Sequence, residues 1–150
     1  MEPVMKKLIA VVTLPLLLTA CQSTGEENNM AKTISVQDLQ HHNWELTQID
    51  GKAVITPDNM QAPRLEIGEK MTANGNAGCN NFFGQGELDG NNFRILQMGM
   101  TMKMCINDVM GTEMVLSQTL PEWNEMKLTK ETMTLTGENH TLTFKLSDWK

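Results

Sequence analysis

The sequence predicts an α+β fold that is mainly β: a small curled antiparallel sheet, or a partly open barrel, of about eight strands with one main helix. Three observations predict it. Short segments with alternating apolar residues recur along the 150 residues, hairpin turn signals separate them, and one helical stretch stands alone. Strands with one apolar face must hide that face, and a sheet that curls on itself leaves the fewest exposed edges.

The first 20 residues are expected to be a lipoprotein signal peptide. Lys6 and Lys7 form a basic start, and the apolar stretch from Leu8 to Leu18 is too short to cross a bilayer. The motif that follows, Leu18-Thr19-Ala20-Cys21, matches the bacterial lipobox, which predicts cleavage before Cys21 and acylation of its thiol. The alternative is an ordinary secretory signal cleaved after Ala20.

The lipobox also predicts where the chain is found. Gln22 after Cys21 resembles lipoproteins sent to the outer membrane, so we expect an outer-membrane lipoprotein that faces the periplasm and is held to the membrane by its lipid anchor. Residues 21–34 are expected to be a flexible tether and residues 35–150 the folded domain. The formal net charge of −6 argues against nucleic acid and anionic lipid surfaces as partners.

The first half of the domain predicts a short capped helix followed by strands. Ser35 and Asp38 resemble an acidic capping box for a helix over Ser35 to Leu39. Five strand segments follow, and turn residues such as Asp50-Gly51 and Asp89-Gly90-Asn91-Asn92 separate them. These segments are Trp44 to Ile49, Arg64 to Ile67, Met71 to Ala73, Gln85 to Leu88 and Phe93 to Leu96.

The second half predicts the main helix and three more strands. The helix is expected from Val109 to Leu120, capped by Asn107-Asp108 and ended by Pro121. Its apolar side is expected to carry Val109, Met110, Met114, Leu116 and Leu120. Alternating apolar residues then mark the last strands at Met126 and Leu128, at Met133 and Leu135, and at Leu142, Phe144 and Leu146.

The stretch from Gly78 to Gly84 is expected to be a tight backbone corner that holds a disulfide. If Cys21 is acylated, Cys79 and Cys105 are the two remaining thiols of three, and an oxidising periplasm favours their pairing. A redox-active pair is the alternative, but the two cysteines lack the two-residue spacing of catalytic dithiols. A structural bond that closes this loop would stabilise the fold by about 3 to 3.5 kcal/mol.

Four methionines at alternate positions, Met98, Met100, Met102 and Met104, would share one side of an extended strand. Thioether sulfur suits Cu(I), but Met also fills irregular apolar surfaces, so the run is interpreted as an apolar wall or a soft-metal surface.

The remaining candidate side chains predict no metal or catalytic site. His41, His42 and His140 lack zinc-ligand spacing and are expected on a solvated surface. The carboxylates of Glu66, Glu87 and Glu113 are too generic to assign as an acid–base pair, although Glu113 lies near the apolar side of the predicted helix.

Several residues together resemble the META-domain family, over about residues 38–146. They are Trp44 and Leu46, Pro63, Leu65 and Ile67, Gly75, Gly78, Cys79 and Asn80, Phe82 and Gly84, Thr101 and Cys105, Glu113, and Leu142 and Phe144. The resemblance implies a small β-rich barrel like that of lipid-binding pilot lipoproteins of secretion systems. It also implies a role in envelope stress, heat shock or antibiotic tolerance, and it supplies no reaction to map onto these residues.

The sequence therefore predicts a non-enzymatic envelope lipoprotein, with no cofactor, that offers an apolar surface to a lipid, a hydrophobic small molecule or an envelope protein. A Cu(I)-handling metalloprotein that uses Met98 to Met104 is the alternative, and a thiol oxidoreductase that uses Cys79 and Cys105 is a further one.

Overall fold

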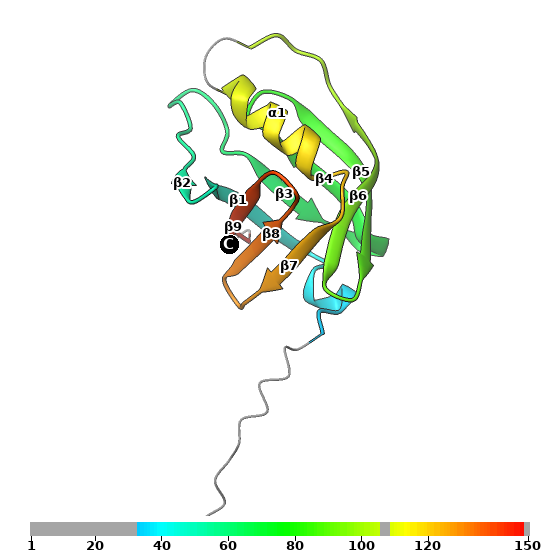
Figure 1. Ribbon diagram of the computed structural model, residues 1–150. Coiled ribbons are helices and arrows are strands. Elements are labelled where there is room, and N and C mark those ends of the chain that lie inside the picture. The colour runs from blue at the N-terminus through cyan, green and yellow to red at the C-terminus, as the bar shows by residue number, and fades with distance from the viewer. Residues whose placement is uncertain (1–32, 106–108, 149–150) are drawn as a thin grey trace, which may run out of the picture. The chain divides into compact units, whose positions relative to one another are not determined.

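A computed structural model describes residues 33–105 and 109–148 of the chain, which form a β-barrel with one α-helix (Figure 1). The predicted signal peptide, Cys21, residues 21–32 of the tether and the Asn107-Asp108 cap lie outside the described residues. The strands are β1 (His42–Ile49), β2 (Lys52–Ala53), β3 (Arg64–Ile67), β4 (Thr72–Asn76), β5 (Asn81–Asp89), β6 (Asn92–Met100), β7 (Asn124–Leu128), β8 (Thr132–Thr136) and β9 (Thr141–Leu146). The helix α1 is Val109–Thr119, and two short 3-10 turns are η1 (Val36–Asp38) and η2 (Glu69–Met71).

The barrel is closed and antiparallel throughout. Sequential neighbours pair from β3 to β9, and β1 pairs with β3 on one side and with β9 on the other. The short strand β2 adds to β1 beyond this ring. The predicted fold class is confirmed, and the β1–β9 pairing closes the sheet that the sequence left curled or partly open.

Alternate residues of the strands fill the barrel. The largest fully buried side chains on the strands are Trp44, Leu65, Ile67, Phe93, Ile95, Met126, Met133, Leu135 and Phe144. Burial of each such side chain contributes about 1.5–3 kcal/mol, so the period-two pattern specifies which face of each strand points inward. Leu128 and Leu146 continue this pattern to the strand ends, where they are only partly buried.

The helix α1 packs against the barrel through a different stripe from the predicted one. Leu116 lies in the core, and Glu113 is only 9% exposed. Met110 and Met114, which were predicted on the apolar side, are 41% and 57% exposed, so this prediction was wrong. At about 100° per residue, Met110 and Met114 lie about a third of a turn around the helix from the stripe that contains Glu113 and Leu116. They therefore face away from the core.

A β-bulge lies at the start of the methionine run, and strand β6 ends in the middle of the run. Strand β6 shifts register opposite Gly84, where Gln97 has a φ of 51°. A Cβ on Gly84 would lie 2.5 Å from Ile95 Cγ2, so only glycine fits this close approach. The strand ends at Met100, and Met102 beyond it is 97% exposed.

The four methionines therefore do not share one strand face, contrary to the expectation for an extended strand. Met98 and Met100 pack against the core, whereas Met102 and Met104 project into solvent, Met104 with 96% of its surface exposed. Among the described helices, none has the length and apolar character needed to cross a bilayer.

Candidate functional site

The loop at residues 77–80 joins β4 to β5 and forms a tighter corner than the one predicted. Ala77 N donates to Asn80 O at 2.8 Å, and Gly78 adopts a φ of +113° that glycine tolerates best. Asn76 Oδ1 accepts a hydrogen bond from Gly78 N at 2.8 Å. Phe82 and Gly84, which were expected in the corner, lie within β5, and Phe82 is buried in the core.

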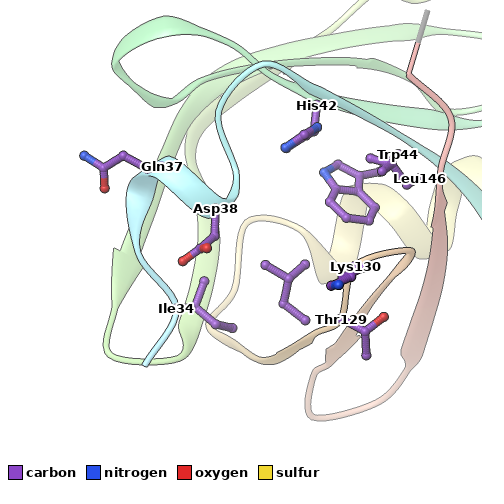
Figure 2. A pocket seen from close by; sticks show the side chains of 9 residues that line it. Ile34, Gln37, Asp38, His42, Trp44, Thr129, Lys130 and Leu146 are labelled. Atoms are coloured by element: carbon purple, nitrogen blue, oxygen red, sulfur yellow. The ribbon is translucent and has the colours of Figure 1, made fainter. Parts of the chain in front are cut away.

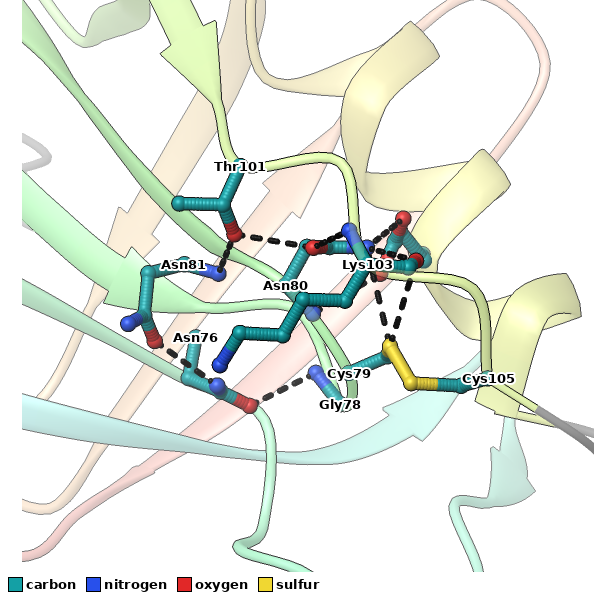
Figure 3. The surroundings of a disulfide bond; sticks show 9 residues. Asn76, Gly78, Cys79, Asn80, Asn81, Thr101, Lys103 and Cys105 are labelled. Carbon is teal, nitrogen blue, oxygen red and sulfur yellow. Dashed lines mark hydrogen bonds between the residues drawn. A yellow bond between two sulfur atoms is a disulfide. The ribbon is translucent and has the colours of Figure 1, made fainter.

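The side chain of Asn80 connects this loop to two other segments (Figure 3). Its Nδ2 donates to Lys103 O at 3.0 Å and to Glu113 Oε1 at 2.8 Å. Its Oδ1 accepts from Lys103 N at 2.7 Å and from Thr101 Oγ1 at 2.8 Å. Glu113 Oε2 also accepts from Asn80 N at 3.0 Å. We call these four residues, Asn80, Thr101, Lys103 and Glu113, the Asn80 network.

A disulfide between Cys79 and Cys105 lies next to the Asn80 network (Figure 3). The two Cα atoms are 6.1 Å apart, and Cys79 is 7% exposed. The bond and the network join the same two segments, the 77–80 loop and the stretch that leads from β6 toward α1. Because the polar side-chain atoms of Asn80 and Glu113 bond to one another and to backbone, this arrangement serves structure rather than substrate binding.

A pocket of about 490 Å³ opens at one end of the barrel, and we call it the Trp44 pocket (Figure 2). It is formed by the η1 segment, the start of β1, the β7–β8 turn and the end of β9. Its lining residues are Ile34, Gln37, Asp38, His42, Trp44, Leu128, Thr129, Lys130 and Leu146. The volume is within the range typical of small-molecule sites.

Trp44 has an unsatisfied hydrogen-bond donor at this pocket. The residue is 2% exposed, and its indole Nε1 has no acceptor among the described residues. The His42 ring packs edge-on against the indole, with centroids 6.0 Å apart. A buried donor without a partner costs about 1–3 kcal/mol, so its retention in a pocket marks a candidate ligand contact.

Two charged side chains that line the pocket, Asp38 and Lys130, differ in the partners they have within the protein. Asp38 Oδ2 accepts hydrogen bonds from Ser35 N at 2.9 Å and from Ser35 Oγ at 2.6 Å, which forms the predicted acidic capping box. Lys130 makes no ion pair within 4.0 Å among residues 33–105 and 109–148, and it is exposed. The cation at the rim is therefore the charge that is open to a ligand.

Two histidine–aspartate pairs hold the ends of the β1–β9 seam. His42 Nδ1 lies 2.7 Å from Asp148 Oδ2 at one end, and His140 Nδ1 lies 2.8 Å from Asp50 Oδ2 at the other. Both histidines were predicted on a solvated surface and are instead partly buried, whereas His41 is exposed, with 64% of its side chain accessible.

The same hydrogen bonds lower the pKa of both aspartates. For Asp50, the Thr141 N–H bond is the main cause, and the bond with His140 adds to it. For Asp148, burial raises the pKa, but the bonds from the Asn43 N–H and from His42 outweigh burial and lower it. Sequence analysis missed both pairs because their partners lie 106 and 90 residues apart.

The other candidate carboxylates are not brought together. Glu66 lies on β3, Glu87 pairs with Arg94 at 2.7 Å, and Glu113 belongs to the Asn80 network. Within the described part of the chain, no three His, Cys, Asp or Glu side chains cluster closely enough to hold a metal ion.

Comparison with known proteins adds to this geometry. A model of the META domain matches residues 37–149. Heat shock protein HslJ of Escherichia coli (strain K12) is 34% identical over 145 residues, which cover 96% of this chain and 98% of that protein. An NMR structure with 34% identity gives a TM-score of 0.68 over 77% of this chain and 97% of that chain. An NMR structure of a protein from Burkholderia xenovorans gives a TM-score of 0.63 at 21% identity, over 97% and 99% of the two chains, and shows likeness of fold alone.

Proposed function

This chain belongs to the META domain family, and on that premise we propose that it is a non-enzymatic, heat-shock-related lipoprotein of the bacterial cell envelope that binds an apolar ligand in the Trp44 pocket. The heat-shock assignment is supported by the name of a relative that is 34% identical over nearly the full chain. The envelope assignment is supported by the basic start, the short apolar stretch and the lipobox Leu18-Thr19-Ala20-Cys21.

The Trp44 pocket is the observation that carries the binding proposal. Its apolar lining comes from Ile34, Trp44, Leu128 and Leu146, and polar residues surround them. Leu128 and Leu146 stay partly exposed although their strands bury the equivalent residues closer to the barrel centre. An apolar lining with a few polar groups is the usual composition of a small-molecule site.

The proposal of a non-enzymatic role is supported by the way the chain uses its polar groups. Glu113 is a buried carboxylate of the Asn80 network, which lies next to the Cys79–Cys105 disulfide, and both of its oxygens accept hydrogen bonds from Asn80. A general acid or base needs an open approach for substrate, whereas these oxygens already hold two segments together.

Binding is tested with an apolar fluorescent probe, N-phenyl-1-naphthylamine, added to full-length protein carrying Cys21→Ser so that no detergent is needed. We expect probe fluorescence to rise and Leu128→Asn to reduce that rise, because the substitution places a polar side chain in the pocket lining. Val54→Asn, at a partly buried residue outside the pocket, is the matched control. Equal fluorescence with all three proteins would reject the pocket as the binding site.

Membrane anchoring is tested separately in cells. Replacing Cys21 by Ser should move the protein from the membrane fraction to the soluble fraction and abolish incorporation of radioactive palmitate. Unchanged fractionation and labelling of the Cys21→Ser protein would contradict the lipoprotein assignment without affecting the pocket.

A further inference from the structure

The Trp44 pocket also indicates what kind of ligand it accepts. We propose that it binds a single-chain amphiphile with an anionic, hydrogen-bond-accepting head group. The head group accepts a hydrogen bond from the Trp44 indole N–H and pairs with the Lys130 ammonium, while the alkyl chain lies against Leu128 and Leu146. This inference rests on the proposed function, since it assumes that the pocket is occupied.

The indole N–H requires an acceptor. β-Ladder pairing with Leu65 and Leu146 fixes the backbone of Trp44, and close packing around a side chain that is only 2% exposed restricts the ring from turning toward a partner elsewhere. Figure 2 shows the indole nitrogen turned toward His42 and the middle of the pocket. A carboxylate or phosphate oxygen that reached this nitrogen would satisfy a donor that is otherwise buried without a bond.

The rim selects an anion rather than a cation. Lys130 carries a charge that no described carboxylate neutralises, while Asp38 already accepts two hydrogen bonds from Ser35. His42 donates from Nδ1 to the Asp148 carboxylate, and its ring packs edge-on beside Trp44. A negatively charged head group thus meets one cation with no described carboxylate partner and one unpaired donor, and the probes below compare it directly with a cationic head group.

The acceptor must pass His42 to reach the indole. The side chain of His42 is 35% exposed and packs edge-on against Trp44 at 6.0 Å between ring centroids. The ring lines the pocket and bonds to Asp148, so a head group that reaches the indole N–H must shift this partly exposed ring. Leu128 and Leu146 supply the apolar part of the lining, against which the alkyl chain lies.

The test uses four probes that share a twelve-carbon chain and differ at the head: dodecanoate, dodecyl phosphate, dodecanol and dodecyltrimethylammonium. Each is titrated below its micelle-forming concentration into the full chain carrying Cys21→Ser, by calorimetry and by ¹H–¹⁵N NMR. The three indole N–H resonances of the chain are assigned with Trp123→Phe and Trp149→Phe, which leave the resonance of Trp44 by elimination. Dodecanoate and dodecyl phosphate both offer an anionic oxygen acceptor. The one that binds with higher affinity indicates whether the natural head group is a carboxylate or a phosphate.

We expect both anions to bind more tightly than dodecanol and the ammonium probe to bind least. The Trp44 indole resonance should shift on binding of an anion, and that of Trp123 should not. Trp44→Phe should weaken binding of the anions and dodecanol by roughly 3- to 10-fold and leave the ammonium probe unchanged, as expected for one lost hydrogen bond. Lys130→Gln should weaken only the anions, by roughly 2- to 5-fold, and Lys127→Gln on β7 should change nothing.

Two outcomes contradict different parts of the argument. If no probe binds, the proposed binding function fails. If all four probes bind with similar affinity, or if anion binding does not shift the Trp44 indole resonance, the pocket binds apolar chains without distinguishing their head groups. In that case the inference fails and the proposed binding function stands. The resonance is measured on the protein with Trp44 intact, so the result holds even if Trp44→Phe does not fold.

Discussion

Two regions of this barrel treat their buried polar groups in opposite ways. In the Asn80 network, the amide and carboxylate atoms of Asn80 and Glu113 all make hydrogen bonds, and the Cys79–Cys105 disulfide joins the same segments. In the Trp44 pocket, the buried indole N–H of Trp44, a residue that is 2% exposed, makes none among the described residues. The first arrangement is complete without a ligand, and the second is not. The proposed ligand contact thus lies apart from the segment in which the buried polar groups of Asn80 and Glu113 are fully bonded.

The largest expected effect comes from removing the centre of the Asn80 network. Asn80→Ala should lower the free energy of unfolding by about 3–5 kcal/mol, because it leaves the buried Glu113 carboxylate without its side-chain donor and frees the backbone of Lys103. Asn92→Ala, at the exposed asparagine that begins β6, is the control. Urea denaturation measures both, and a loss below about 1 kcal/mol for Asn80→Ala would show that the network is dispensable.

The disulfide should have an effect of similar or smaller size. Cys79→Ser and Cys105→Ser should each cost about 2–5 kcal/mol, and the double variant should be no worse because each single change removes the whole bond. Titration with a thiol reagent measures the bond directly in the native, unreduced protein. Two titratable thiols there would contradict the bond and favour the thiol oxidoreductase alternative.

A substitution at the Trp44 pocket is expected to lower the free energy of unfolding much less. Trp44→Phe should destabilise the protein by about 1 kcal/mol from reduced packing, since the indole N–H that it removes makes no hydrogen bond. Thermal unfolding without ligand measures this. A loss of about 3 kcal/mol or more would contradict this expectation, and the difference in stability between the pocket and the Asn80 network would then disappear.

The smallest effect concerns the β1–β9 seam, one end of which borders the pocket. The pKa values of Asp50 and Asp148 lie below the ordinary 3.8, so ionised Asp stabilises the fold. This contribution is fully present above about pH 4 and is lost as the pH falls through the lowered pKa values of the folded state. Asp50→Asn and Asp148→Asn should each make stability less dependent on pH in this acid range, as followed by circular dichroism. Asp89→Asn, at the exposed end of β5, should leave the acid profile unchanged.

Much of the fold was predictable from local patterns. The alternation from Arg64 to Ile67 matches β3 residue for residue, and the Asp89–Asn92 turn lies where β5 meets β6. The family was recognisable because the Gly78-Cys79-Asn80 element carries a backbone shape and contacts that few other residues satisfy. The inward position of Glu113 also followed from its helical spacing.

The functional details were less predictable because they depend on contacts distant in sequence. Helical spacing placed Glu113 near the apolar side but could not predict its role, since Glu113 accepts its hydrogen bonds only when Asn80 is in place. His42 meets Asp148 only after the barrel closes. The Trp44 pocket arises from the arrangement of four segment ends, so no single stretch of sequence encodes it.

The pairing of β1 with β9 has a consequence for the order in which the chain acquires its structure. Trp44 pairs with Leu146, so a strand near the start of the domain has to keep an edge unpaired until one of the last segments has been synthesised. Contacts of such long sequence separation form slowly, and an unpaired edge invites association with other chains in the meantime. Loss of β9 would expose the edges of both β1 and β8 at once. A chain that stops short of residue 141 is therefore expected to aggregate rather than to fold as a smaller barrel.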